Sequence, residues 1–600
     1  MRTWILTGVL ILGMLGSVEA VLSPKAHKAL QVLDDVDEEV NRALRDYGVP
    51  GIAVGIVVDG ELIFAKGYGQ RDLEQQLPVT PATIFPVGSC TKSFTAFMLG
   101  NLIDEGLLSW DQPVVETLPD FRLYNEYATL NVTVRDVISH RTGLARHPFM
   151  AYNSGMTKLE ALKRLRFLEP ACDLRERYYY NDLMFVVAEA LIEQVTGKTW
   201  SEVLHERVLR PLGMKNTTCS IADMQLFTDV SAPYLEKNGK LKRISYRELS
   251  PLRPAGGLNS NVYDMAEWVK LHLNNGVYQG KTLMTRVTLQ EMHSPQMVIA
   301  GVSEHPGSII NSCGLGWFIQ SHRGHYNICH HGGLDGFTSF MSLLPREGVG
   351  VIVLGNRNLS MLPYILSLHF LDRALGIKST VWIEEGLKQL AKEKASQGER
   401  TKKEGMQRKL GTNPLHPLEA YVGEYSHPGY GTMKIELING ALHATLHGLT
   451  MVLGHWHYDV FNIEEEVQDA CYSRVGFKFS FHNDSLGDVG EVVVPFESSV
   501  ADIVFKKRPN PTASSFDYLM QFVGPYDVED VTVEIMLRGG ALYAVIPGQP
   551  LYEMVPNGSN EFTVKKLAGL SVRFLLNEEN QVEEVLLIAP YGAMSAKPKR

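Results

Sequence analysis

Ser89 and Lys92 form a Ser-x-x-Lys motif at the point where the turn Pro86-Val-Gly-Ser89 opens a predicted helix over residues 93–107. Three residues are close to one helical turn, so the Ser89 hydroxyl and the Lys92 amine lie on the same face. A neutral lysine at that spacing can accept the serine proton while the serine oxygen attacks a carbonyl carbon. Because a free lysine has a pKa of about 10.4, burial or a neighbouring cation has to lower the pKa of Lys92. The motif predicts Ser89 as nucleophile and Lys92 as base, although about two such spacings arise by chance in a chain this long.

A Tyr-x-Asn pattern follows at Tyr179 and Asn181, directly before a predicted helix over residues 182–196. A tyrosine there can relay a proton to a leaving group, and an asparagine amide can hold a substrate carbonyl. Each residue also has a structural interpretation, because tyrosines pack cores and asparagine caps helices. We predict Tyr179 as a catalytic residue and Asn181 as a substrate contact.

The third pattern is His330-His331-Gly332-Gly333, which leads into a predicted strand over residues 336–344. Glycines at a strand edge let a substrate backbone approach closely. A histidine on that edge could contact the serine, the tyrosine or a substrate carboxylate. Taken singly, either histidine is better explained as an ordinary surface or capping residue. We predict His330, Gly332 and Gly333 as substrate-binding residues.

The elements around these motifs predict an α/β fold, an α+β sandwich. Two strands over residues 51–58 and 61–65 flank an Asp-Gly dipeptide, which is typical of a tight hairpin turn. A late strand pair covers residues 336–344 and 349–354, and the middle of the chain has helical periodicity. We therefore expect the terminal strands to share one antiparallel sheet that packs against a helical domain.

The three motifs in this order resemble those of the serine β-lactamase and penicillin-binding-protein family, closest to its class C and esterase-like branch. The likeness covers about residues 30–375, and it includes Ile138–Leu144, Pro254–Ser260 with Asp264, Gly314–Trp317 and Val349–Asn356.

The resemblance implies a residue-by-residue assignment. Ser89 would be the acylated nucleophile, Lys92 its base, Tyr179 the proton shuttle and Asn181 a substrate contact. His330 would stand where many relatives have the lysine of Lys-Thr-Gly, and the N–H groups of Ser89 and Gly333 would form the oxyanion hole. Histidine in place of lysine removes a permanent positive charge. This weakens the case for penicillin hydrolysis and leaves ester or amide hydrolysis open, including that of D-amino-acid peptides.

The remainder of the chain divides into a charged segment and two repeats. The resemblance implies a β-lactamase-like hydrolase domain over residues 21–380. The mostly basic stretch within 381–413 predicts a linker, with a solvated helix as the alternative. Two β modules follow, over residues 414–508 and 509–600, because three segments recur in the same order about one hundred residues apart. The recurring pairs are Tyr421–Tyr425 with Phe522–Tyr526, Ile435–Leu442 with Ile535–Leu542, and Gly476–Phe481 with Gly569–Phe574. They predict two small antiparallel barrels.

Residues 1–20 have the pattern of a signal peptide, with Arg2, an apolar run over residues 4–15 and Val18-Glu19-Ala20. We therefore expect a secreted, extracellular protein without a membrane span. Six cysteines would permit a bridge such as Cys172 to Cys219. Glycosylation is plausible because five Asn-x-Ser/Thr sequons occur, at Asn131, Asn216, Asn358, Asn483 and Asn557.

Other partners are not indicated by the sequence. The net charge of −10 over 600 residues, without a basic aromatic patch, gives no reason to expect nucleic acid. His455-Trp-His457-Tyr-Asp459 resembles the start of a zinc motif, but Val460 stands where the next histidine is needed, so we predict no metal. No phosphate-loop spacing occurs, and no cofactor is expected.

Two functions are compatible with these patterns. The first is a secreted acyl hydrolase acting on a small-molecule, ester or peptide substrate. The second is a non-catalytic extracellular matrix or binding protein that keeps the fold, as in β-lactamase-like components of mollusc shell matrix. The complete set of Ser89, Lys92, Tyr179 and Asn181 favours the first.

Overall fold

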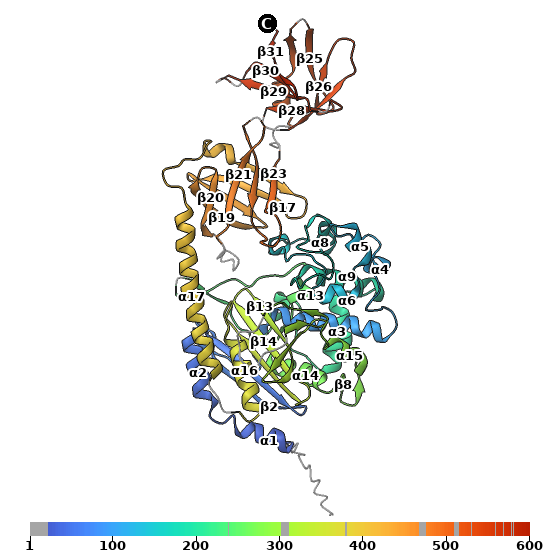
Figure 1. The fold of residues 1–600 in the computed structure, drawn as a ribbon, viewed down its shortest axis with the longest axis vertical. Helices are drawn as coiled ribbons and strands as arrows, with labels where there is room; N and C mark the ends of the chain where they lie inside the picture. Colours follow the sequence, from blue (N-terminus) through green and yellow to red (C-terminus); the bar gives the residue numbers. More distant parts are fainter. Residues whose placement is uncertain are drawn as a thin grey trace, which may run out of the picture.

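The computed structural model describes most of the chain beyond the expected signal peptide. The described residues are 22–237, 239–301, 311–377, 381–466, 476–485, 487–508, 515–529, 531–557, 560–567, 569–577, 579 and 581–599. Residues 1–20 and Cys471 lie outside them. Figure 1 shows a large mixed α/β domain, one long helix along its side, and two small barrels that follow one another to the C-terminus.

One nine-stranded antiparallel sheet forms the centre of the first domain. Its order is β10 (Met297–Val298), β11 (Asn311–Cys313), β12 (Phe318–His322), β13 (His325–Leu334), β14 (Phe337–Leu344), β15 (Val349–Gly355), β1 (Gly51–Val58), β2 (Glu61–Asp72) and β3 (Leu77–Pro78). Strand β1 pairs with β15, with Ile52 opposite Gly355, so the prediction that the terminal strands share one sheet is confirmed. Asp59 and Gly60 turn between β1 and β2 with positive φ of 51° and 81°, the conformation that an Asp-Gly hairpin turn requires.

Helices cover both faces of this sheet. On one face pack α1 (Pro24–Gln31), α2 (Val36–Tyr47) and α16 (Leu362–Ala374), which share a core with Val54, Val58 and Val353. The other face carries the longer helices α3 (Thr91–Asp104), α9 (Leu183–Thr196) and α14 (Val262–Leu273). Helix α3 is buried along nearly its whole length and therefore has no solvent-facing stripe. A helix fixed on all sides is a rigid support for the residues at its N-terminus.

Short elements complete the helical region. The helices are α4 (Val114–Thr117), α5 (Glu126–Asn131), α6 (Val134–Ile138), α7 (Pro148–Ala151), α8 (Lys158–Arg164), α10 (Trp200–Leu204), α11 (Arg210–Leu212), α12 (Ile221–Met224), α13 (Arg253–Gly256) and α15 (Arg286–Met292). Three small sheets pair β4 (Phe85–Pro86) with β7 (Asn259–Ser260), β5 (Tyr234–Lys237) with β6 (Lys240–Arg243), and β8 (Val277–Tyr278) with β9 (Lys281–Thr282).

The charged segment is not an irregular linker but helix α17 (Val381–Gln407), so the favoured interpretation was wrong and the solvated helix is correct. Its first turn is anchored, because Trp382 and Ile383 are buried and the Trp382 indole donates to Asp372 at 2.7 Å. Leu387 and Leu390 continue this packing, and lysine, glutamate, glutamine and alanine, which favour a helix, make up most of the rest. Figure 1 shows α17 running along the side of the first domain up to the first barrel.

Two closed eight-stranded barrels confirm the predicted repeat. The first contains β16 (Gly423–His427), β17 (Gly431–Ile438), β18 (Ala441–Leu446), β19 (Leu449–His457), β20 (Val460–Glu466), β21 (Lys478–Asn483), β22 (Val489–Val494) and β23 (Ile503–Lys507). The second contains β24 (Gly524–Val528), β25 (Val531–Arg538), β26 (Ala541–Val545), β27 (Tyr552–Pro556), β28 (Glu561–Val564), β29 (Ser571–Leu576), β30 (Val582–Ala589) and β31 (Gly592–Pro598), with α18 (Phe516–Met520) before it.

Matching hydrogen bonds support the internal duplication. The Tyr425 hydroxyl donates to the Tyr421 carbonyl at 2.8 Å in the first barrel, and Tyr526 donates to the Phe522 carbonyl at 3.0 Å in the second. The barrels differ in how they attach. The first shares a continuous apolar core with the first domain, whereas the second is tied to the first barrel by an ion pair between Arg573 and Asp488 at 2.6 Å.

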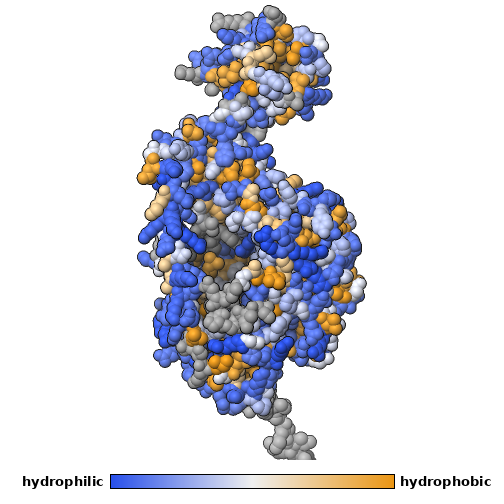
Figure 2. Space-filling model, viewed as in Figure 1, coloured by the Kyte–Doolittle hydropathy of each residue, from blue (hydrophilic) through white to orange (hydrophobic). Residues whose placement is uncertain are grey.

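Cys172 and Cys219 are free thiols, as are the other cysteines that the structure describes, so that pairing was wrong. Among the described helices, none combines the length and the apolar character needed to cross a bilayer. Figure 2 shows a largely hydrophilic face along α17 and the first domain, with apolar residues scattered over it.

Candidate active site

The turn that carries Ser89 is held between helix α3 and strand β13. A single 3₁₀ turn over Gly88–Cys90 leads into α3, and Gly88 has a positive φ of 51°. A Cβ atom on Gly88 would lie 2.8 Å from the Gly333 nitrogen, and one on Gly332 would lie 2.0 Å from the Val87 carbonyl oxygen. Glycine is therefore needed at Gly88 and Gly332 so that β13 can approach the serine turn.

Lys92 is buried one helical turn after Ser89, as its spacing predicts. Its Nζ donates to Ser89 Oγ at 3.1 Å, to the Ala255 carbonyl at 2.9 Å and to Asp182 Oδ1 at 2.5 Å. The lysine side chain has no exposed surface. Its three partners occupy all three N–H directions of an ammonium group. The Pro254–Ser260 segment thus contributes a carbonyl that orients the base.

The tyrosine register in the structure differs by one residue from the predicted one. Tyr180, not Tyr179, lies beside the serine and lysine: Lys92 Nζ is 4.8 Å from the centre of its ring, and its buried hydroxyl faces Ser89. That hydroxyl completes no hydrogen bond with any described residue. Tyr179 does not line the site, and its N–H donates to the His140 carbonyl at 2.9 Å.

The same shift places Asp182, not Asn181, in the pocket. The Asn181 amide is fully buried and donates to the backbone carbonyls of Ala145 and Leu144, while its Oδ1 accepts from the Met184 N–H at the start of α9. Asn181 is therefore the helix cap that the structural interpretation allowed, and it is not among the residues that line the pocket, where the prediction of a substrate contact would need it. An aspartate takes the place next to Lys92.

The histidine pair on β13 shows a further difference. His331 and Gly333 line the pocket, because successive residues of a strand point to opposite sides. His330 points away from it and is buried against Phe318, 5.0 Å between ring centres. His330 and Gly332 thus lie behind the pocket wall and not among its lining residues, which differs from the predicted placement of both.

The charged groups of the site are arranged as a row of cation, anion and cation. Burial lowers the pKa of Lys92, and the carboxylate of Asp182 opposes this effect. Burial would raise the pKa of Asp182, but Lys92 and Arg146 outweigh it and hold that pKa below its usual value. Arg146 approaches Asp182 Oδ2 at 3.4 Å and lies over the Tyr180 ring at 5.4 Å. The site thus holds a permanent cation, Arg146, although neither histidine of β13 supplies one.

Tyr180 and the two histidines near it, His140 and His331, are neutral at physiological pH. Burial raises the pKa of Tyr180 far above its usual value, so the phenol keeps its proton. Burial also lowers the pKa of His140 to about 3 and that of His331 to about 4. A protonated phenol beside a lysine whose pKa is lowered is the pairing needed for a proton donor and a base.

A cavity of about 600 Å³ opens onto Ser89. Its wall is mostly apolar, with Leu249, Leu252, Leu334 and Leu359 among the lining residues. The buried Asp335 in this wall accepts hydrogen bonds from Tyr152 and, at 2.9 Å, from Arg247. This combination of an apolar wall with a few fixed polar groups is typical of a small-molecule or peptide site.

The two loops that supply the site are tied together by Asp136. This fully buried carboxylate pairs with Arg141 at 2.5 Å and with Arg175 at 2.7 Å, and it accepts from the Thr133 N–H at the start of α6. Arg141 lies shortly before Arg146 in the chain, in the same loop, and Arg175 lies shortly before Tyr180. The loops carrying the cation and the phenol are thus fixed to one anion.

Asp136→Asn is expected to destabilise the first domain by about 2–4 kcal/mol at pH 7, because the variant leaves two arginines without their buried anion. Burial opposes ionisation, but Arg175 and Arg141 hold the pKa of Asp136 below its usual value. The stabilisation is therefore complete above the unfolded-state pKa of about 3.9 and is lost as the pH falls below it. Chemical denaturation at pH 7 and at pH 3, below the unfolded-state pKa, measures the difference, which should shrink at the lower pH. The exposed pair of Glu436 with Lys434 provides a control, because Glu436→Gln should change stability by less than about 0.5 kcal/mol.

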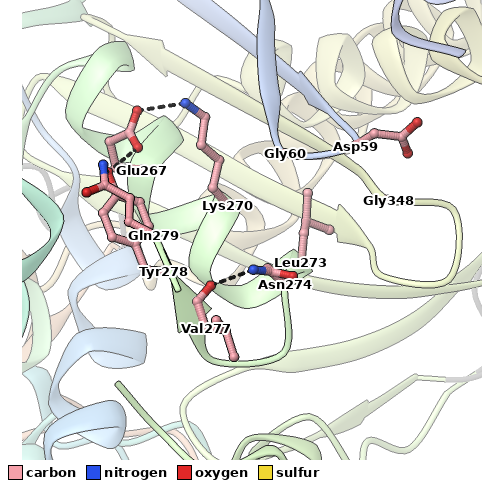
Figure 3. A pocket seen from close by; sticks show the side chains of 10 residues that line it. All are labelled: Asp59, Gly60, Glu267, Lys270, Leu273, Asn274, Val277, Tyr278, Gln279 and Gly348. Atoms are coloured by element: carbon pink, nitrogen blue, oxygen red, sulfur yellow. Dashed lines mark hydrogen bonds and ion pairs between the residues drawn. The ribbon is translucent and has the colours of Figure 1, made fainter. Parts of the chain in front are cut away.

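A second cavity, of about 590 Å³, lies between the β1–β2 turn and α14, but its lining residues do not form a catalytic set (Figure 3). Lys270 pairs with Glu267 at 2.8 Å, and the Asn274 amide donates to the Val277 carbonyl. No serine, cysteine or histidine is among its ten lining residues. Within the described residues there is also no group of three histidine, cysteine, aspartate or glutamate side chains placed to hold a metal.

Reasoning from the sequence missed Arg146, Tyr180, Asp182 and His331. The sequence does contain a signal for Tyr180 and Asp182. Tyr180-Asn181-Asp182 has the same spacing as Tyr179-Tyr180-Asn181 and overlaps it, with aspartate in place of asparagine at the third position. Arg146 lies in no motif, and its position follows from the fold alone.

Comparison with known proteins agrees with this geometry. Residues 36–365, more than half of the chain, match the family model described as Beta-lactamase, and residues 407–507 match a domain of unknown function, DUF3471. The unguisins hydrolase ungD′ of Aspergillus campestris is 31% identical over 67% of this chain and 77% of its own, and ungD of Aspergillus violaceofuscus is 28% identical over 68% and 78%.

A solved structure shows the same fold. The octameric penicillin-binding protein homologue from Pyrococcus abyssi is similar with a TM-score of 0.53 and 22% identity, over 78% of this chain and 99% of that one. The chain belongs to the β-lactamase family and is a serine hydrolase of the β-lactamase and penicillin-binding-protein type.

Proposed function

We propose that the protein is a secreted acyl hydrolase that acts through a Ser89 acyl-enzyme on esters or peptide amides with an apolar acyl group. The observation that carries this proposal is the contact of 3.1 Å between Lys92 Nζ and Ser89 Oγ, with the protonated Tyr180 phenol beside them. The apolar wall of the cavity favours an apolar acyl side chain. This set of groups supports catalysis over the alternative of a binding or matrix protein, which needs none of them.

The reaction begins when Ser89 Oγ attacks the substrate carbonyl carbon and its proton passes to neutral Lys92. The N–H groups of Ser89 and Gly333 are placed to donate to the developing oxyanion, since β13 lies against the serine turn. Tyr180 then donates its proton to the leaving alcohol or amine as the carbonyl–heteroatom bond breaks, and it regains a proton from Lys92. Water attacks the ester of Ser89 in the same way and releases the acid.

The proposal is tested by labelling the full-length protein with a fluorescent alkyl phosphonate and with a penicillin probe. We expect phosphonate labelling, with the adduct on the peptide that contains Ser89, at a rate that rises with pH as Lys92 loses its proton. A panel of aryl esters and D- and L-amino-acid anilides, each with apolar and charged acyl groups, then identifies the substrate class. A folded protein that reacts with neither probe and hydrolyses none of these compounds would contradict the proposal and favour the binding or matrix role.

Secretion is the second part of the proposal and rests on the sequence of residues 1–20. Three of the five sequon asparagines, Asn131, Asn483 and Asn557, are exposed, whereas Asn358 is buried and lines the cavity. Protein collected from the medium of an expressing eukaryotic cell should begin near residue 21. Glycans on the exposed asparagines and none on Asn358 would agree with an open active site.

A further inference from the structure

The segment Arg146–Asn153 is a wall with two faces. Five of its residues line the cavity: Arg146, His147, Pro148, Ala151 and Tyr152. Two others face the first barrel: Phe149 stacks on Phe496 with ring centres 4.7 Å apart, and the Asn153 amide donates to the His447 carbonyl at 2.7 Å. The first barrel therefore supports one side of the active site from behind.

His147 is the residue of this wall that the barrel holds most firmly. It is buried and has a left-handed backbone, with φ 43° and ψ 56°, a conformation that non-glycine residues rarely adopt. Its N–H donates to Glu497 Oε2 at 3.0 Å, and its two ring nitrogens bond to the Tyr430 hydroxyl at 2.9 Å and the Glu169 carbonyl at 2.8 Å. A backbone conformation of this kind persists only where the surrounding contacts hold it in place. Two of the three partners of His147, Glu497 and Tyr430, belong to the barrel.

Arg146 precedes His147 in the chain, so the peptide fixed by Glu497 and Tyr430 sets the direction of the arginine. Arg146 reaches Asp182, which in turn accepts from Lys92. Neither Glu497 nor Tyr430 lines the cavity. Any influence of these two residues on the reaction has to pass through the wall.

We propose that Glu497 and Tyr430 of the first barrel are positioning residues that hold Arg146 beside the Asp182–Lys92 pair, which makes the barrel a working part of the active site. The inference rests on the proposed role of Lys92 as the base.

The expected effect is a change in pH dependence, because Arg146 disfavours a second positive charge on Lys92. The other groups that face Lys92 are Asp182, Tyr180, Cys90, His140, His330 and His331. Burial keeps the histidines, the phenol and the thiol neutral near pH 7, so Asp182 and Arg146 are the charges that act on the lysine. Displacing Arg146 raises the pKa of Lys92, so a higher pH is needed to obtain the neutral base.

The first test compares barrel variants of the full-length protein, with phosphonate labelling rates and hydrolysis of an apolar aryl ester measured from pH 5 to pH 10. Glu497→Ala should move the acid limb of kcat/KM upward by about 0.5–1 pH unit and lower kcat/KM at pH 7 about 3- to 10-fold. Glu497→Gln keeps an acceptor and should stay close to wild type. Tyr430→Phe should shift the limb in the same direction, and it carries the test if Glu497→Ala does not fold. Glu436→Gln, an exposed position of the same barrel, is the control that should shift nothing.

The second test is a double-mutant cycle with Arg146→Gln, which separates positioning from general loosening of the fold. Arg146→Gln alone should shift the acid limb at least as far as Glu497→Ala. Adding Glu497→Ala to Arg146→Gln should shift it no further. Additive shifts, or a lower melting temperature without any shift, would overturn the inference and leave the proposed function intact. A wild-type protein that neither labels nor hydrolyses would instead contradict the proposed function, and the inference with it.

Discussion

Ser89→Ala is expected to abolish phosphonate labelling and to lower kcat by about 10⁴-fold or more for any substrate that the wild-type protein hydrolyses. The reason is that the acyl-enzyme cannot form without the serine oxygen, while binding and the oxyanion donors leave a small residual rate. Lys92 keeps its contacts with Asp182 and the Ala255 carbonyl in this variant, so the site should remain folded.

The matched control for this prediction is Ser109→Ala, an exposed serine of the same domain. It should label and hydrolyse at the wild-type rate. Equal melting temperatures for the two variants would show that any loss at position 89 is chemical. Persistent labelling of the Ser89→Ala variant would locate the reactive nucleophile elsewhere and refute the assignment.

The elements that position Ser89 were predictable from the sequence because each depends on local signals. Continuous apolar runs predicted β1 and β15, and the Asp59-Gly60 dipeptide predicted the hairpin that joins β1 to β2. The Ser-x-x-Lys spacing predicted the contact between Ser89 and Lys92, because a helix has one geometry at that separation. The two barrels were predictable because the chain repeats.

The parts that were not predictable depend on contacts between distant segments. Three consecutive tyrosines followed by Asn181-Asp182 permit two registers, and the choice is made by Asn181, which is held by carbonyls of the loop at 144–145. Arg146 joins the site because a barrel more than 280 residues later fixes His147. The charged stretch could not be assigned from its composition, which suits both a linker and a helix. The residue that anchors helix α17, Trp382, lies before that stretch.

The register of the tyrosine is the second point on which the mechanism depends. Tyr180→Phe is expected to lower kcat about 10²- to 10⁴-fold, because the phenol that protonates the leaving group is lost. The fold should not suffer, since the Tyr180 hydroxyl makes no hydrogen bond with a described residue and its removal leaves no partner unsatisfied. The effect should be larger for anilides than for aryl esters, because an amine leaves only with a proton and a phenolate leaves without one.

Tyr179→Phe is the control next to it, and it separates the register in the structure from the one that the sequence favours. Tyr179 contributes its backbone N–H to the His140 carbonyl, which phenylalanine preserves, so kcat should stay within about threefold of wild type. The opposite result, a loss at Tyr179 and none at Tyr180, would mean that the loop takes the alternative register in solution. Asn181 and not Asp182 would then face Lys92, and the row of charges from Arg146 to Lys92 would not exist. Comparing Tyr180→Phe with Tyr179→Phe thus tests which tyrosine protonates the leaving group. The same comparison tests whether Asp182, and with it Arg146, lies beside Lys92.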